Sequence, residues 1–166
     1  MGQTTEVRRA IKTFFAPEMT RKGFVVDNRD MPMRLTFRRC AADGVQVCDI
    51  QWDKRGRPRF VVNFGSCGPR GVICYGLAVE AKDVFPSQVP VAGRLGPRSG
   101  SWNGSWFRQD RPWLASLFLQ SRLLPAEDVV AQLLRLFPEV ERYWATGEVG
   151  PHLRTLPRRG YSQEWA

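Results

Sequence analysis

Three successive segments between residues 33 and 64 alternate apolar and polar side chains, and this alternation constrains the fold more than any other feature. Successive side chains of a β-strand point to opposite faces, so each alternating segment predicts a strand with one apolar and one polar face. The apolar positions are Met33, Leu35 and Phe37, then Cys48, Ile50 and Trp52, then Phe60, Val62 and Phe64. Three neighbouring strands are therefore expected.

The two connections between these segments predict how the strands pair. A loop at residues 41–44, closed by Cys40 and Val45, gives the opposed pairs Phe37–Cys48, Leu35–Ile50 and Met33–Trp52. A three-residue turn at residues 55–57 gives the pairs Trp52–Phe60, Ile50–Val62 and Cys48–Phe64. Opposed residues share a face of the sheet, so both hairpins are expected to bury their apolar side chains together. The sequence thus predicts an α+β fold in which an antiparallel sheet of about four to five strands is packed on one face by an N-terminal helix and C-terminal helices.

The segments on either side of these hairpins fill in the predicted domain. Val7, Ala10, Ile11 and Phe14 recur at helical spacing, and Pro17 is expected to kink or restart this first helix. Residues 71–79 are nearly all apolar and predict a fourth strand, whereas residues 86–105 are rich in Pro, Gly and Ser and predict a long connection. Helices are expected to begin near residue 110 and at Pro125, the second with Val129, Leu133, Leu136, Phe137 and Val140 inward. Residues 1–149 are interpreted as one domain and 150–166 as an irregular C-terminal tail.

The sequence lacks the features that several functional classes require. No apolar run is long enough to span a membrane and no secretory signal is visible, so the expectation is a cytoplasmic protein that does not enter membranes. The four cysteines, Cys40, Cys48, Cys67 and Cys74, form no Cys-x-x-Cys pair and are expected to be buried free thiols. The one histidine, His152, is expected in an exposed loop. We therefore predict no catalytic residue, no metal and no cofactor.

The polar face of the predicted sheet carries a first group of candidate binding residues. The register places Arg34, Arg38, Asp49, Gln51 and Asn63 on one face, opposite the apolar side chains. Such a face is either solvated, which we take as the simpler interpretation, or the floor of a groove that binds a polar ligand.

A second group lies in the tryptophan-rich segment 101–113, SWNGSWFRQDRPW. Trp113 is expected in the stripe of the helix that follows, and Trp106 and Phe107 are expected to pack the connection against the sheet. This leaves Trp102, Arg108 and Arg111 as candidates for a surface contact.

The net charge of +9 at pH 7 would by itself suggest an acidic partner such as nucleic acid, since positive charge attracts phosphate, but the basic residues are mostly Arg and are scattered along the chain. The densest basic cluster, KRGRPR at residues 54–59, falls in the predicted turn. We interpret it as a solvated surface rather than a dedicated nucleic-acid site.

The order of these features resembles a bacterial family catalogued as domain of unknown function 4304, over about residues 8–140. The similarity is carried by FFAPEMTRKGF, LTFRR, VCDIQWDK, RFVVNFGS, GRLG and SWNGSWF, in that order. The resemblance implies an α+β architecture and assigns no catalytic residue.

Three functions remain as hypotheses. The first is a non-enzymatic binding or regulatory module that acts on another protein, for example an immunity protein that neutralises its partner. The alternative is a nucleic-acid-binding protein that uses its basic surface with exposed Trp and Arg. The second alternative is an enzyme with a site on the polar sheet face, where Arg34, Arg38 and Asp49 would contact the substrate. The sequence leaves the oligomeric state open.

Overall fold

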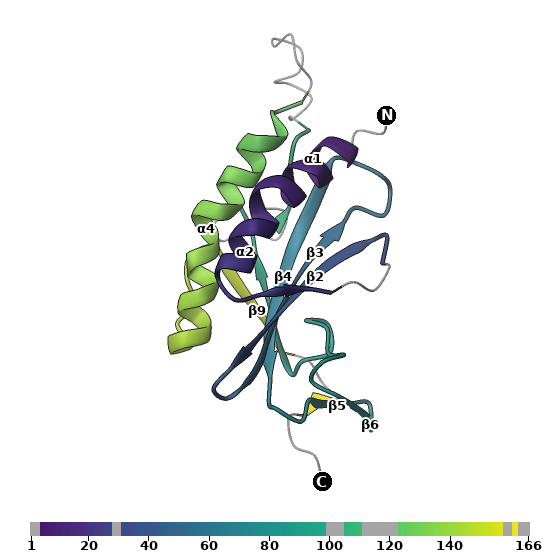
Figure 1. Cartoon of the computed structure of the whole chain (residues 1–166), viewed down its shortest axis with the longest axis vertical. Helices are drawn as coiled ribbons and strands as arrows, with labels where there is room; N and C mark the ends of the chain where they lie inside the picture. The colour runs from purple at the N-terminus through teal and green to yellow at the C-terminus, as the bar shows by residue number, and fades with distance from the viewer. Residues whose placement is uncertain (1–3, 28–30, 99–104, 111–122, 158–160, 163–166) are drawn as a thin grey trace.

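An antiparallel sheet forms the centre of the protein, and helices cover one of its faces (Figure 1). The computed structural model describes residues 4–27, 31–98, 105–110, 123–157 and 161–162. In this part of the chain the sheet has seven strands, in the order β1-β2-β3-β4-β7-β9 with β8 also paired to β4. Their bounds are β1 Val25–Val26, β2 Arg34–Ala41, β3 Gly44–Trp52, β4 Arg59–Cys67, β7 Val91–Leu95, β8 Phe107–Arg108 and β9 Leu153–Pro157. The predicted α+β class is confirmed, with a wider sheet than the four to five strands expected.

The register of the two central hairpins is the one that the alternation predicts. Phe37 faces Cys48, Ile50 faces Val62, and Trp52 faces Phe60. Met33 lies just outside β2, and its carbonyl accepts a hydrogen bond of 3.0 Å from the Trp52 N–H. Its side chain is 39% exposed, so the prediction that Met33 is buried is wrong.

The first helical segment is continuous but contains a wider turn. It comprises α1 (Thr4–Ala10), the π-helical turn η1 (Ile11–Phe15) and α2 (Ala16–Arg21). Pro17 has no N–H to donate to the preceding turn, and a π turn just before it absorbs this defect without ending the helix. The extra residue rotates the side chains that follow, so Phe15 is buried and Phe14 is 47% exposed. The expectation that Phe14 faces the core is therefore wrong.

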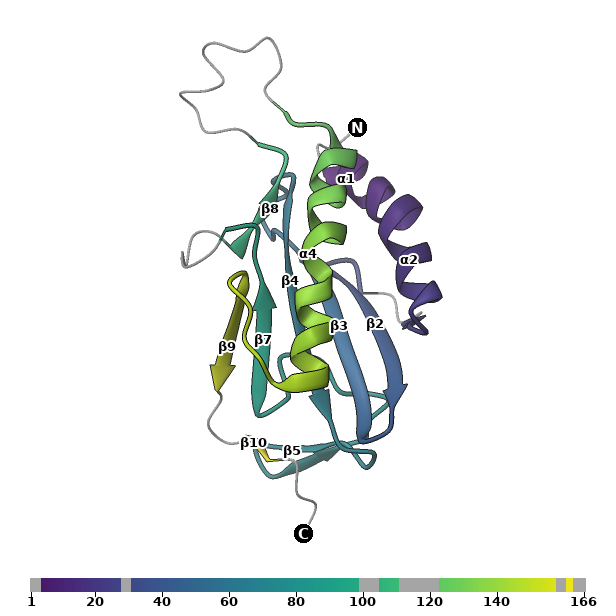
Figure 2. The same ribbon diagram turned by 90° about the vertical axis from the view of Figure 1, so that its left-hand side faces the viewer.

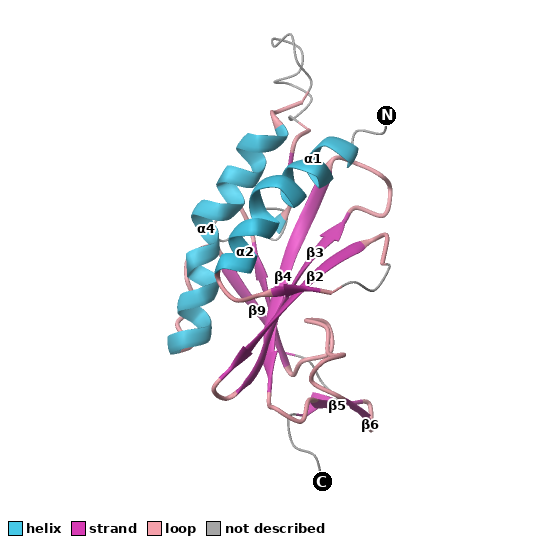
Figure 3. Ribbon diagram, in the orientation of Figure 1, coloured by secondary structure: helices cyan, strands magenta, loops and turns pink. Residues whose placement is uncertain are grey.

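The long helix α4 (Ala126–Thr146) supplies the other half of the helical layer, as Figures 2 and 3 show. It follows Pro125, passes Pro138 and ends at Thr146, where Gly147 forms a left-handed cap with a φ of 75°. All the positions predicted to face inward are buried: Val129, Leu133, Leu136, Phe137 and Val140. In the core, Phe15 meets Phe37 and Phe137 edge to face, with ring centroids 5.6 Å and 5.5 Å apart. The predicted helix layer is confirmed for these elements. Within the described residues, no helix is both long and apolar enough to cross a membrane.

Two predictions for the middle of the chain are wrong. Residues 71–79 form the hairpin β5 (Val72–Cys74) and β6 (Leu77–Val79), which joins β10 (Tyr161–Ser162) in a separate three-stranded sheet. The turn between them has positive φ at both Tyr75 and Gly76, as a type I′ hairpin turn requires. The continuous apolar run gives no sign of this turn in the sequence. Residues 86–105, expected to be a connection, contain β7, which pairs with both β4 and β9.

Residues 153–157 belong to the central sheet. Residues 150–166 were expected to be irregular, but β9 pairs with β7 along its whole length. The Nδ1 atom of His152 lies 2.6 Å from Oε1 of Glu139 on α4, and its side chain is 27% exposed. His152 is thus a partly buried link between α4 and the sheet rather than an exposed loop residue.

The face of the sheet opposite the helices is covered at one end. A second apolar cluster packs there, beneath the β5–β6 hairpin and the segment of residues 80–90, and consists of Cys67, Val72, Ala81, Val84, Val89 and Ala92. The approach is close, because a Cβ at Gly65 would lie 2.6 Å from a methyl group of Val89. Of the four thiols, Cys48 and Cys67 are buried, Cys74 is half-buried and Cys40 is exposed, so burial was predicted wrongly for Cys40.

Candidate binding groove on the polar face of the sheet

The uncovered end of this second face brings the predicted polar residues together. The register aligns Arg34 with Gln51, Asp49 with Asn63, and Asn63 with Arg94. Because each residue is directly opposed to its partner, all of these side chains project from the same face, across the four strands β2, β3, β4 and β7.

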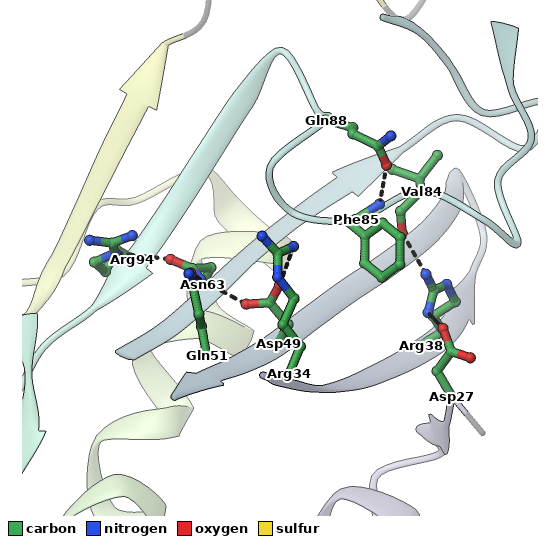
Figure 4. Close-up of polar contacts among 10 residues, drawn as sticks. All are labelled: Asp27, Arg34, Arg38, Asp49, Gln51, Asn63, Val84, Phe85, Gln88 and Arg94. Carbon is green, nitrogen blue, oxygen red and sulfur yellow. Dashed lines mark hydrogen bonds and ion pairs between the residues drawn. The ribbon is translucent and has the colours of Figure 1, made fainter. Parts of the chain in front are cut away.

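Asp49 is the centre of this polar arrangement (Figure 4). Its Oδ1 accepts a 2.7 Å hydrogen bond from Nδ2 of Asn63, and its Oδ2 lies 3.4 Å from Nη1 of Arg34. Asn63 in turn accepts a 2.9 Å bond from Nε of Arg94. A further contact of 3.3 Å joins Nδ2 of Asn63 to Oε1 of Gln51. The four side chains around Asp49 are therefore held in fixed positions.

The environment of Asp49 is unusual for a carboxylate, because only 1% of the residue is exposed. Burial raises the pKa of Asp49, and this effect exceeds the opposing influence of the Asn63 hydrogen bond and of nearby Arg34, Arg94 and Arg38. Thr36, on the neighbouring strand, is also buried. The interpretation of this face as simply solvated is therefore wrong at these two positions.

Arg38 does not join the other predicted residues. Its guanidinium donates 2.8 Å bonds to the Asp27 carboxylate and to the Val84 carbonyl. The Phe85 ring lies near both arginines, with its centroid 5.3 Å from Cζ of Arg38 and 5.8 Å from Cζ of Arg34. Arg38 thus attaches the covering segment 80–90 to β2, and its role is to hold that segment in place (Figure 4).

Beside the Asp49 network lies a groove of about 690 Å³, which we call the cationic groove. Its basic lining residues are Arg34, Lys54, Arg55, Arg57, Arg59 and Arg94. Gln51, Trp52, Trp106 and one acid, Asp53, also line it. Like charges gathered in one concave surface focus the electrostatic potential there.

Asp53 organises the basic turn at the end of this groove. Its carboxylate accepts hydrogen bonds from the Arg55 backbone N–H at 2.7 Å, from Nε of Arg57 at 3.0 Å, and from Nε of Arg59. Burial by itself would raise the pKa of Asp53, but these hydrogen bonds and the charge of Arg59 outweigh it and lower the pKa to about 2. The side chain is only 3% exposed, so its negative charge is enclosed within the turn.

Trp106 closes the other side of the groove. Cζ of Arg59 lies 4.4 Å from the centroid of the Trp106 ring, a cation–π contact that fixes both side chains. Its neighbour Phe107 is buried in β8 and stacks on Phe60 with ring centroids 5.2 Å apart. The expected packing of this pair against the sheet is thus confirmed for Phe107, whereas Trp106 contributes to the groove.

The remaining predicted contact residues lie elsewhere. Arg108 is exposed and pairs with Asp110 at 2.7 Å, outside the groove lining. Trp102, Arg111 and Trp113 fall outside the described residues, as does the helix expected after residue 110. The structure therefore places Arg34 and Gln51 in the groove and Asp49 and Asn63 beneath it, whereas Arg38 lies outside the groove, at the covered end of this face.

Two parts of the groove were not predicted from the sequence. Arg94 lies in a segment interpreted as a connection, and only the pairing of β7 with β4 brings it beside Asn63. The cluster at residues 54–59 was visible as a run of charge, but the sequence did not show that it borders a concave surface.

The chemistry available in the described part of the chain is limited. No group of three or more His, Cys, Asp or Glu side chains there is arranged to hold a metal ion. Burial, and secondarily the charge of Asp49, raises the pKa of the Cys48 thiol well above its ordinary value, so this thiol is unsuited to act as a nucleophile.

No family model, curated protein or solved structure matches the chain. The resemblance to the family of unknown function stays a prediction.

Proposed function

We propose that the protein is a non-enzymatic binding module that recognises an acidic surface of another protein through the cationic groove. The observation that carries this proposal is the charge of the lining, in which six basic side chains face one acid that is already enclosed by its own hydrogen bonds. Complementary charge of this kind accelerates association and selects among partners.

The two carboxylates near the groove favour binding over catalysis. Asp49 and Asp53 are both buried, and each accepts hydrogen bonds from its neighbours. In this arrangement they position Arg34, Arg57 and Arg59. An arginine guanidinium that is held in place loses less conformational entropy when it binds a carboxylate on a partner.

A protein partner fits the groove better than a nucleic acid does. Binding of single-stranded nucleic acid relies on aromatic rings that stack on bases. In the described groove, Trp52 is only 5% exposed, and Arg59 already lies against Trp106. Guanidinium groups bind carboxylates and phosphates alike in a bidentate manner, so the preference for a protein partner rests on these two rings rather than on the arginines. The net charge of +9 keeps nucleic acid as the second candidate.

The experiment uses the basic turn, where Lys54 and Arg55 are exposed. Fluorescence anisotropy is measured at low ionic strength with a labelled oligoglutamate peptide and with a labelled oligothymidylate. We expect the wild-type protein to bind the peptide, and the double variant Lys54→Gln/Arg55→Gln to bind it about tenfold more weakly, since each exposed ion pair contributes up to about 1 kcal/mol.

The matched control is Arg135→Gln/Arg142→Gln, which removes the same charge from exposed positions on α4. This control is expected to retain most of the affinity. Equal weakening by both double variants, or no binding of the peptide at low salt, would contradict the proposal. Binding of the oligothymidylate alone would identify the protein as a nucleic-acid binder.

A further inference from the structure

A second basic hollow lies between the N-terminal helix and the start of β2. Its volume is about 880 Å³, and its basic lining residues are Arg8, Arg9, Lys12 and Arg34. The acid in its lining is Asp27, whose carboxylate pairs with Arg38 at 2.8 Å. This hollow therefore carries an excess of positive charge, as the cationic groove does.

The hollow and the groove share two lining residues. Arg34 and Trp52 line both of them. The Trp52 ring also connects the two, since Cζ of Arg8 lies 4.8 Å from its centroid. Together they form one basic track that runs from Arg94 on β7, past Arg34 on β2, to Arg9 and Lys12 on the helix.

The track changes direction at the end of the sheet. Arg34 and Gln51 lie on the face that bears the groove, whereas Leu35 and Trp52 lie on the face that packs against the helices, because side chains alternate along each strand. A rigid convex surface can contact only one of these faces. An extended, flexible segment can follow the track around the sheet end.

We infer that the track binds an extended acidic segment of the partner, a run of Asp and Glu residues that lies in the groove and continues past Arg34 into the second hollow. This inference rests on the proposed function and adds the form of the ligand. Arg9 and Lys12 are exposed, so they are accessible to carboxylates of such a segment.

The spacing of the strands gives the length of peptide that can occupy the groove without reaching the second hollow. From β2 to β7 there are three steps between neighbouring strands, each about 4.8 Å, or about 14 Å in all. An extended chain that rises about 3.3 Å per residue crosses this distance with about four residues. A peptide of that length fills the groove alone, whereas one about three times as long also reaches the hollow.

The test compares these two lengths of oligoglutamate by fluorescence anisotropy. We expect Arg9→Gln/Lys12→Gln to weaken binding of the long peptide about tenfold and to leave the short peptide unchanged, within about twofold. Lys54→Gln/Arg55→Gln is expected to weaken both. The substituted side chains are exposed, and circular dichroism with a thermal melt confirms that each variant is folded.

The outcomes separate the two proposals. If the groove variant weakens binding but the hollow variant leaves the long peptide unaffected, the extended segment is disproved and the proposed function stands. If neither variant weakens binding, both are disproved. If an oligothymidylate of equal charge binds more tightly than the long peptide and loses affinity in both variants, the track belongs to a nucleic acid and the acidic segment is overturned.

Discussion

Asn63 donates a 2.7 Å hydrogen bond from Nδ2 to Oδ1 of Asp49, the residue directly opposite it on β3. The same amide accepts a hydrogen bond from Arg94, so one side chain links a buried carboxylate to a cation of the groove. The pair thus connects the stability of the sheet with the arrangement of the binding surface.

Removing this link is expected to destabilise the protein. Asn63→Leu leaves the Asp49 carboxylate buried with one donor fewer, so the free energy of unfolding should fall by about 1–3 kcal/mol in urea denaturation. In the Asp49→Asn background the buried charge is absent, so Asn63→Leu should lower the free energy of unfolding by less. A double-mutant cycle measures this coupling, and strictly additive effects would show that the hydrogen bond carries no energy of its own.

The low pKa of Asp53, about 2, gives the stability a defined pH dependence. In the unfolded chain the pKa of an Asp is about 3.9. As the pH falls from about 4 to 2, the unfolded state therefore takes up a proton that the folded state does not. The contribution of Asp53 is therefore full above about pH 4 and is lost below it. Urea denaturation across this range should show the stability difference between the wild type and Asp53→Asn shrinking as the pH drops.

Asp43→Asn, in the exposed turn between β2 and β3, removes the same charge without disturbing the basic turn and serves as the control. Carbon NMR of the Asp53 carboxyl provides an independent measurement. A midpoint near the ordinary value of an aspartate would contradict the hydrogen-bonded arrangement described for the turn.

Gly93 is a position in the sheet where a single added methyl group should be harmful because of packing alone. A Cβ there would lie 2.1 Å from Cζ of Phe64, which is fully buried and packs edge to face on Tyr143 and Trp144. Gly93→Ala should therefore lower the free energy of unfolding by about 1–3 kcal/mol, with a corresponding drop in Tm. Gly68→Ala, where a Cβ meets nothing within 4 Å, is the control. Equal melting temperatures of the two variants would refute the packing described.

The thiols should differ in reactivity. Cys40 is exposed, whereas burial raises the pKa of both Cys48 and Cys67, and the thiolate is the reactive form. Mass spectrometry after maleimide treatment should find Cys40 modified in the folded protein and Cys48 only after denaturation. In a Cys40→Ser variant, the rapid modification by maleimide should be absent. Rapid labelling of Cys48 under native conditions would mean that the β3 core opens readily.

The alternation of apolar side chains was sufficient to predict the central sheet, because a shift of one residue would expose every core side chain of β3. It failed where backbone geometry departs from regular patterns. The π turn rotated Phe15 inward in place of Phe14, and the positive φ of Tyr75 split an apolar run into two strands. β7 and β9 were not predicted because a glycine, a proline and basic residues interrupt the apolar alternation along these two strands.

The same limits applied to the site. Arg34, Gln51, Asp49 and Asn63 followed from the register of the two hairpins, which is local information. Arg94 required a strand pairing between distant parts of the chain, and the groove also takes lining residues from the turn at residues 54–59 and from Trp106. Neither property is encoded in the spacing of nearby residues.

The covering segment at residues 80–90 is a place where the length of the chain can change during evolution. It ends the open area of the sheet at Phe85 and is attached through Arg38, while the helical core lies on the opposite face. Connections of this kind tolerate insertions and deletions better than the strands beside them. A longer or shorter segment would change how much of this face is open beside Arg34, which Phe85 contacts, without disturbing strand register or the aromatic core. Loop length is thus an independent means, open to evolution and to protein engineers, of matching one framework to partners of different size.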